Sequence, residues 1–410
     1  MGDPAAQPNA QRVSLADVEA ARELIRDVAI VTPMEQSRWL SAIVDGQVWL
    51  KCENLQRTGS FKIRGGYVRI SRLTPEERAR GVVAASAGNH AQGVALAAQL
   101  LGIRSTVFMP EGAPIPKERA TRAYGADVVF EGAVLEESLA AARRFADETG
   151  AVLIHPFDHV DIVAGQGTLG LEVLEQVPDV QTVLVPTGGG GLLAGVALVI
   201  KEKRPDVRVV GVQAAGAAAY PDSLRRGEPV RLESMKTMAD GIAVGVPGPI
   251  PFAEVRDHCD EVRTVSEESL SRALLALVER AKMVVEPAGA AGVAALLDTP
   301  HDFRAPVVAV LSGGNIDPLL LGKVIRHGMA AAGRYLNLHV TIPDSPGGLA
   351  RLLTEVGASG ANVLEVMHER ISPQLLLDEV EVQLQLETRG PQHSEQVLAR
   401  LRERGYRVLE

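Results

Sequence analysis

Residues 57–66 of the chain read RTGSFKIRGG and place one lysine between two apolar residues. Lys62 stands between Phe61 and Ile63 where a loop is expected to pass into a helix, with Ser60 as the predicted cap of that helix. Apolar surroundings disfavour the charged ammonium and lower the pKa of a lysine, so more neutral amine is present. A neutral amine can form a Schiff base with an aldehyde. The stretch predicts either a reactive lysine or a solvated lysine whose stem lies along apolar neighbours.

Short valine-rich runs alternate with helical segments on both sides of the protein's midpoint. Such runs are typical of parallel strands that are buried on both faces. We expect strands at residues 48–52, 82–85, 106–109, 128–130, 152–154, 182–185, 207–212 and 307–311. The pattern therefore predicts an α/β architecture built on parallel sheets.

The pattern changes near Gly333, after which the chain predicts β-α-β-β-α-β, the ferredoxin-like order. The expected strands are 336–342, 363–370, 379–386 and 406–409, and the expected helices are 347–357 and 394–404. Residues 1–12 are rich in Ala, Pro, Gln and Asn and predict a flexible tail.

Composition excludes several classes of protein. The net charge of −9 argues against a nucleic-acid or anionic-membrane partner. The two cysteines, Cys52 and Cys259, form neither a disulfide framework nor a zinc spacing, and none of the nine histidines has a metal-ligand spacing. The longest apolar run, near residues 192–200, is far shorter than a membrane span, and no signal-peptide pattern opens the chain. We expect a cytoplasmic protein without a metal site.

Three loops share one design, in which an apolar strand leads through small residues and glycine into a helix; they are 86–90, 187–191 and 312–315. Ligands of open α/β sheets bind at the carboxyl ends of the strands, so the loops predict one shared site. The four consecutive glycines at 188–191 leave backbone N–H groups unshielded at a helix N-terminus, which favours a phosphate over a plain flexible turn. Asn89 and Ser312 could bind a flat polar ring, although a cap or turn role fits each equally well.

Residues 165–170 read GQGTLG and match the G-x-G-x-x-G pattern of dinucleotide-binding proteins. That pattern requires a strand directly before it and an acidic residue about 20 residues later. Residues 155–161 separate it from the preceding strand, and the next strand ends in Pro186-Thr187. An NAD-dependent oxidoreductase is therefore disfavoured, and uptake of NAD would be needed to revive it.

Together these motifs resemble the fold-type II pyridoxal-phosphate enzymes, and most closely the threonine ammonia-lyases among them. The resemblance covers residues 14–330 and is carried by ENLQ at 53–56, TGSFKIRG at 58–65, SAGNHAQG at 86–93, GGGGL at 188–192, EP at 286–287 and SGGN at 312–315. Residues 334–410 resemble an ACT domain, a module that binds amino acids, on DSPGGL at 344–349 and ANV at 361–363. The resemblance implies a catalytic domain at 13–330, with a small subdomain at roughly 65–160, and a regulatory domain at 334–410.

The resemblance also implies pyridoxal 5'-phosphate as the cofactor and a role for each matching residue. Lys62 would bind the cofactor and act as base on the α-proton of the substrate. Phe61 would pack beside the ring, Asn89 would bind the ring hydroxyl, and Ser312 would bind the ring nitrogen. The loop that begins at Ser86 would bind the substrate carboxylate. The N–H groups expected to bind the phosphate are those of Gly188, Gly189, Gly190, Gly191 and Leu192.

The implied reaction is elimination of water from L-threonine to give 2-oxobutanoate and ammonia, with L-serine as a second substrate. A serine at the ring nitrogen does not enforce a pyridinium, so loss of a β-hydroxyl competes well with racemisation. Racemases of this fold carry a serine where this chain has Ala87, which disfavours racemisation here. Relatives that bind a cation carry an acidic residue where this chain has Gln213, so no metal is expected.

Other functions stay open at this point. A serine or 3-hydroxyaspartate ammonia-lyase would differ only in the substrate pocket, where a methyl group is worth about 1–3 kcal/mol. A non-catalytic amino-acid sensor would use the ACT-like domain alone. The resemblance implies a homo-oligomer regulated by isoleucine or valine. The sequence does not distinguish a dimer from a tetramer, or a biosynthetic from a catabolic role.

Overall fold

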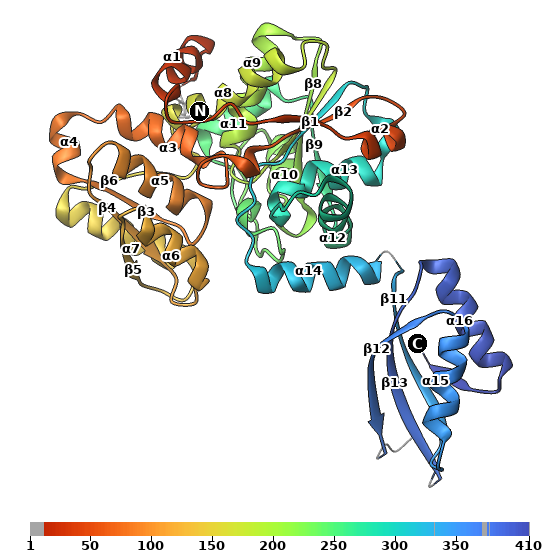
Figure 1. Ribbon diagram of the computed structural model, residues 1–410. Coiled ribbons are helices and arrows are strands. Elements are labelled where there is room, and N and C mark those ends of the chain that lie inside the picture. The colour runs from red at the N-terminus through yellow and green to blue at the C-terminus, as the bar shows by residue number, and fades with distance from the viewer. Residues whose placement is uncertain (1–11, 332, 371–374, 377, 410) are drawn as a thin grey trace, which may run out of the picture. The chain divides into compact units, whose positions relative to one another are not determined.

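The computed structural model describes residues 12–331, 333–370, 375–376 and 378–409. The chain divides into two compact units, Met1–Pro318 and Leu319–Glu410 (Figure 1). The division comes before nearly all of helix α14 (Pro318–Ala331), whereas the sequence places the domain boundary after it. None of the helices in the described part of the chain combines the length and the apolar character needed to cross a bilayer.

The larger sheet of the first unit has six strands in the order β1-β2-β10-β7-β8-β9. All neighbouring strands are parallel except β1, which pairs antiparallel with β2 at one edge. The strands are β1 (Met34–Gln36), β2 (Val48–Lys51), β10 (Val307–Val310), β7 (Thr182–Pro186), β8 (Arg208–Ala214) and β9 (Glu261–Val265). The sequence missed β1 and β9, because these edge strands are only partly buried and carry polar residues rather than valine runs.

The smaller sheet of this unit has four parallel strands in the order β5-β4-β3-β6. These strands are β3 (Val82–Ala85), β4 (Ser105–Met109), β5 (Asp127–Phe130) and β6 (Val152–Leu153). The two parallel sheets confirm the predicted α/β fold.

Helices pack around both sheets of the first unit (Figure 1). They are α1 (Leu15–Ile25), α2 (Arg38–Val44), α3 (Lys62–Ser71), α4 (Pro75–Arg80), α5 (Asn89–Leu100), α6 (Ile115–Ala123), α7 (Leu135–Thr149), α8 (Val160–Gln176), α9 (Gly191–Lys203), α10 (Tyr220–Arg226), α11 (Pro249–His258), α12 (Glu267–Ala276) and α13 (Ala291–Asp298). Helix α12 ends at Ala276, where a π-helical turn (Leu277–Ala281) follows it.

The GQGTLG segment lies in the middle of α8 and is a packing surface. A Cβ at Gly165 would lie 2.5 Å from Gly65 Cα on α3, and a Cβ at Gly167 would lie 3.0 Å from Gly195 O on α9. The glycines are explained by the close approach of three helix backbones, those of α3, α8 and α9.

The second unit confirms the β-α-β-β-α-β order. Its antiparallel sheet has the strand order β12-β13-β11-β14. The elements are β11 (Tyr335–Pro343), α15 (Gly348–Ala358), β12 (Asn362–Glu369), β13 (Glu379–Glu387), α16 (Pro391–Glu403) and β14 (Arg407–Leu409). Val380, Val382, Leu384 and Leu386 of β13 alternate into the core of this unit, which is the pattern of a sheet covered on one face.

Candidate active site

The three small-residue loops follow β3, β7 and β10 at the carboxyl ends of these strands, and the Lys62 stretch joins them. Ser60 forms an isolated antiparallel bridge with Gly313. Phe61 N–H donates to Ser312 O at 3.2 Å, and Gly314 N–H donates to Gly59 O at 2.8 Å. The loop before Lys62 therefore lies directly against the loop that follows β10.

The prediction that Ser60 caps the helix is wrong. Helix α3 begins at Lys62, and the N-cap position belongs to Phe61, which makes no side-chain cap hydrogen bond. The bridge to Gly313 holds Ser60 in an extended pairing instead, and its hydroxyl is buried without a partner among the described residues.

Lys62 is partly buried, in a weakly charged environment. Its Nζ donates to Pro156 O at 3.0 Å and lies 5.1 Å from the centre of the Phe61 ring. Burial lowers the pKa of Lys62 to about 8, although the Glu286 carboxylate acts in the opposite direction. A substantial neutral fraction near neutral pH gives this lysine the character of a nucleophile.

The four glycines form a tightly packed cradle, in which Gly189 and Gly190 leave no room for a Cβ. A Cβ at Gly189 would lie 2.4 Å from the Phe157 ring, and a Cβ at Gly190 would lie 1.7 Å from the Tyr220 hydroxyl oxygen. Gly190 has a φ of 99°, in the region that favours glycine. Two bulky side chains therefore press against the loop from outside and hold its shape.

The same loop presents unpaired donors. Gly190 occupies the N-cap position of α9 without a side-chain cap. Among the described residues, no N–H group from 188 to 193 donates to a protein acceptor. Bare N–H groups at the positive end of a helix bind a phosphate well. The cradle thus fits the phosphate of the expected cofactor, and Phe157 follows Pro156, which accepts from Lys62.

Asn89, the first residue of α5, forms a hydrogen bond to a buried acid. Its Nδ2 donates to Glu286 Oε1 at 2.6 Å. Burial raises the pKa of Glu286 to about 7, with a further rise from Asp240 and an opposing effect from Lys117. The sequence analysis named Glu286 only as part of a motif, and its position between Val285 and Pro287, after an apolar run, was the available signal.

The remaining predicted residues also lie at the carboxyl ends of the strands. Ser86 Oγ accepts from Gly88 N–H at 3.1 Å, which shapes its own loop. Ser312 is buried, and its carbonyl accepts from Phe61. His90 Nε2 contacts Ile154 O at 2.8 Å, and burial lowers the pKa of His90 to about 3, so a neutral ring donates to this carbonyl.

An ion pair connects α6 with the turn that follows Ala239. Lys117 Nζ lies 2.7 Å from Asp240 Oδ2. The same ammonium would lie 3.9 Å from a Cβ at Gly88, so it stands beside the loop expected to bind a carboxylate. Sequence reasoning missed this pair because 123 residues separate its members.

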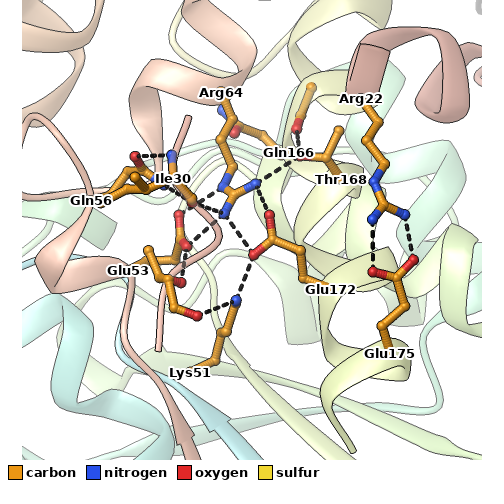
Figure 2. A network of polar contacts seen from close by, with 12 residues as sticks. Arg22, Ile30, Lys51, Glu53, Gln56, Arg64, Gln166, Thr168, Glu172 and Glu175 are labelled. Atoms are coloured by element: carbon orange, nitrogen blue, oxygen red, sulfur yellow. Dashed lines mark hydrogen bonds and ion pairs between the residues drawn. The ribbon is translucent and has the colours of Figure 1, made fainter. Parts of the chain in front are cut away.

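A buried charge cluster lies behind the first turn of α3 (Figure 2). The Arg64 guanidinium donates to both oxygens of Glu53, at 2.8 Å each, and to both oxygens of Glu172, at 2.6 and 3.0 Å. Lys51 Nζ lies 2.5 Å from Glu172 Oε2. These four charges, which we call the Arg64 cluster, tie β2 and α8 to the helix that begins with Lys62.

In the described part of the chain, no group of three or more His, Cys, Asp or Glu residues is arranged to hold a metal ion. Gln213, at the position where some relatives carry an acid, accepts through Oε1 from Tyr220 N–H at 2.9 Å.

Comparison with known proteins agrees with this geometry. The family described as pyridoxal-phosphate dependent enzyme matches residues 25–313. An L-threonine ammonia-lyase of Thermotoga maritima is 46% identical over 396 residues, which cover 97% of this chain and 99% of the relative. An L-threonine ammonia-lyase of Geobacter sulfurreducens is 47% identical over 95% of this chain and 98% of its own length.

Solved structures show the same similarity over most of the chain. The processed form of threonine deaminase isoform 2 from Solanum lycopersicum has a TM-score of 0.74 and 35% identity, over 80% of this chain and 94% of its own. A maize serine racemase has a TM-score of 0.73 and 35% identity, over 78% of this chain and 99% of its own. The family match, the near full-length relatives and the shared fold establish that the chain belongs to the fold-type II pyridoxal-phosphate dependent enzymes.

Proposed function

We propose that this protein is a threonine ammonia-lyase that converts L-threonine to 2-oxobutanoate and ammonia and also acts on L-serine. The observation that carries the proposal is the partly buried, low-pKa amine of Lys62, which bonds to Pro156 O next to Phe157, the residue that packs against a glycine loop with free N–H groups. Two relatives named L-threonine ammonia-lyase, similar over nearly the whole chain, support the choice of substrate.

In this proposal Lys62 binds the aldehyde of pyridoxal phosphate, and the N–H groups of Gly188, Gly189, Gly190, Gly191 and Leu192 hold its phosphate. Phe61 packs beside the ring, Asn89 binds the ring hydroxyl, and Ser312 binds the ring nitrogen. The loop from Ser86 to His90 binds the substrate carboxylate.

The bound cofactor supplies an electron sink that acidifies the α-proton of an amino acid. The substrate amine would displace Lys62 from the aldehyde, the freed Nζ would take the α-proton, and the β-hydroxyl would leave with one proton as water. Tautomerisation and hydrolysis of the released enamine consume one water and give the 2-oxo acid and ammonia. The neutral fraction of Lys62 suits it to this work as a base.

The test of this function is release of 2-oxo acid from L-threonine, L-serine and 3-hydroxyaspartate, each with and without isoleucine. We expect the highest kcat/KM for L-threonine, lower turnover of L-serine, and a change in rate with isoleucine. Preference for 3-hydroxyaspartate would reassign the substrate. No 2-oxo acid from any of the three would overturn the lyase proposal and favour a sensor.

The pH dependence of cofactor capture should report the amine of Lys62. Only the neutral amine attacks an aldehyde, so the rate at which apoprotein takes up pyridoxal phosphate should rise with pH, with its midpoint near pH 8. In Glu286→Gln the midpoint should fall, because the carboxylate that raises the pKa of Lys62 is gone. Stopped-flow absorbance would measure both profiles. A rate independent of pH across this range would contradict the assignment.

Gly190→Ala should remove most cofactor affinity. The added Cβ would meet the Tyr220 hydroxyl at 1.7 Å, and φ of 99° strains any other residue, so the loop must move away from its phosphate-binding shape. Gly227→Ala is the matched control, since Gly227 also has a positive φ, of 77°, but nothing lies within 4 Å of its Cβ position. Equilibrium dialysis should show weaker binding by about tenfold or more in Gly190→Ala alone, the equivalent of about 1.4 kcal/mol. Equal losses in both variants would refute a specific cradle.

The second unit is proposed to bind isoleucine or valine and to pair with a second copy, which makes the protein a regulated homo-oligomer. Gly347, with a φ of 79°, precedes α15. The Gly348 N–H donates to Ser345 O at 3.0 Å, while the N–H groups of Leu349 and Ala350 have no acceptor among the described residues and are open to a carboxylate. A cytoplasmic location is also proposed, because Cys52 and Cys259 are both free thiols.

A further inference from the structure

Three loops of the active site meet at one side-chain amide, that of Asn315. Its Nδ2 lies 2.6 Å from Thr58 O, 2.8 Å from Asn89 Oδ1 and 3.5 Å from Gln92 Oε1. Thr58 belongs to the loop before Lys62, Asn89 and Gln92 belong to α5, and Asn315 follows β10. The other end of the amide, Oδ1, packs against the Cα of Gly59, where a Cβ would lie 2.4 Å away.

The backbone carbonyl of Thr58 decides which way this amide faces. A carbonyl oxygen can only accept, so the atom of Asn315 that faces it must be the NH₂ group. That same NH₂ group faces Asn89, so the atom of Asn89 that meets it must be its oxygen. The NH₂ group of Asn89 then faces Glu286 at 2.6 Å. The orientation of both amides thus follows from one main-chain oxygen.

We propose that Asn315 is a positioning residue that fixes Asn89 as a hydrogen-bond donor to the cofactor. Nδ2 of Asn89 has two hydrogens, and Glu286 takes one of them. The second has no acceptor among the residues that the structure describes. A ring oxygen bound by Asn89 is therefore bound as an acceptor, which favours its deprotonated form. This inference rests on the proposed function, since it concerns how the site holds pyridoxal phosphate.

Two substitutions at 315 separate polarity from space filling. Asn315→Asp keeps the shape of the side chain but replaces the NH₂ group by an acceptor, so Asn89 is driven to turn its own NH₂ group away from Glu286. Asn315→Ala removes the side chain, and the Glu286 carboxylate still holds the NH₂ group of Asn89. If Asn315 orients the Asn89 amide, Asn315→Asp should weaken binding of the ring hydroxyl more than Asn315→Ala does. If Asn315 only fills space, Asn315→Ala should weaken it more.

The readout is the dissociation constant of dialysed apoprotein for two compounds, pyridoxal 5'-phosphate and 3-deoxypyridoxal 5'-phosphate, which lacks the ring hydroxyl. Equilibrium dialysis gives both constants. We call the dissociation constant for the 3-deoxy compound divided by that for pyridoxal 5'-phosphate the hydroxyl ratio. A hydrogen bond to a charged group is worth about ten- to a hundredfold in affinity. We expect the hydroxyl ratio to fall by about tenfold or more in Asn315→Asp, and by less than about threefold in Asn315→Ala.

Asn54→Asp is the matched control. Asn54 is also a largely buried asparagine whose Nδ2 donates to a backbone carbonyl, Val284 O at 3.2 Å, and no contact joins it to Asn89. Asn54→Asp should change the affinity for both compounds by the same factor. A second experiment avoids the charge that Asn315→Asp introduces. In Glu286→Gln the residue at 286 can no longer fix the direction of the Asn89 amide, so only Asn315 does. The hydroxyl ratio should survive Glu286→Gln and fall when Asn315→Ala is added.

An unchanged hydroxyl ratio in Asn315→Asp would overturn this inference, and so would an equal or larger fall in Asn315→Ala. A fall of the hydroxyl ratio in Glu286→Gln alone would also overturn the inference, because Glu286 would then be the residue that fixes the orientation of the Asn89 amide. Wild-type protein that binds pyridoxal phosphate and gives one of these results leaves the proposed function intact. Wild-type protein that binds neither compound would overturn the proposed function together with the inference.

Discussion

Replacing Lys62 with alanine is expected to lower the rate of 2-oxo acid release from L-threonine by at least about 10⁴-fold. The variant loses both the nucleophile that would bind the cofactor and the base that would remove the α-proton. No other amine is expected to replace that of Lys62. The ammonium of Lys117 lies near Gly88, in the loop that follows β3, but it is paired with Asp240. The steady-state rate with excess pyridoxal phosphate measures this loss.

Lys62→Arg is the appropriate companion variant. An arginine keeps the positive charge and much of the bulk, but it stays protonated at any working pH and cannot act as a nucleophile. Its activity should be as low as that of the alanine variant. Borohydride reduction of the loaded wild-type protein should attach the cofactor to the peptide that contains Lys62. Activity within about tenfold of wild type in either variant, or label on a different lysine, would show that the role has been given to the wrong residue.

Replacing Arg64 with methionine should reduce the free energy of unfolding by about 3–5 kcal/mol, the usual effect of breaking a buried ion pair from one side. Glu53 and Arg64 are both fully buried, and Glu172 is 5% exposed. Without the guanidinium, two buried carboxylates would share the single ammonium of Lys51. Desolvation would then act against Glu53, whose pKa Arg64 now helps to keep below its usual range. Urea unfolding followed by circular dichroism would measure the difference.

The control uses the same partner helix, α8. Arg22 pairs with Glu175 of α8 in an exposed ion pair, with side chains 40% and 54% exposed, and Figure 2 shows it beside the Arg64 cluster. Arg22→Met should cost less than about 1 kcal/mol, because exposed pairs contribute little. Arg64→Lys should fall between the two, since it restores the charge without the two-pronged geometry. Equal effects of Arg64→Met and Arg22→Met would mean that the cluster does not stabilise the fold.

The sequence specified the fold because its signals are local. Valine runs, glycine turns and helix caps act within a few residues, so they can be recognised without knowing what lies opposite. Ser14 and Asp17 form a capping box at the start of α1, and β13 of the ferredoxin-like unit alternates between buried and partly buried residues. The errors fell where a distant contact overrides a local preference, as at Ser60, which pairs with Gly313 instead of capping α3.

The sequence by itself determined the α/β fold, the ferredoxin-like second unit and the glycine loop, and it singled out Lys62 as the candidate nucleophile, since each is written in adjacent residues. Only the tertiary structure decided which polar groups face one another: Asn89 with Glu286 across 197 residues, Lys117 with Asp240 across 123, and Asn315 with Thr58 across 257. The physical reason is that burial and hydrogen-bond direction depend on the partner. A carboxylate has a pKa near 7, or an amide faces one way, only because of what the fold brings against it.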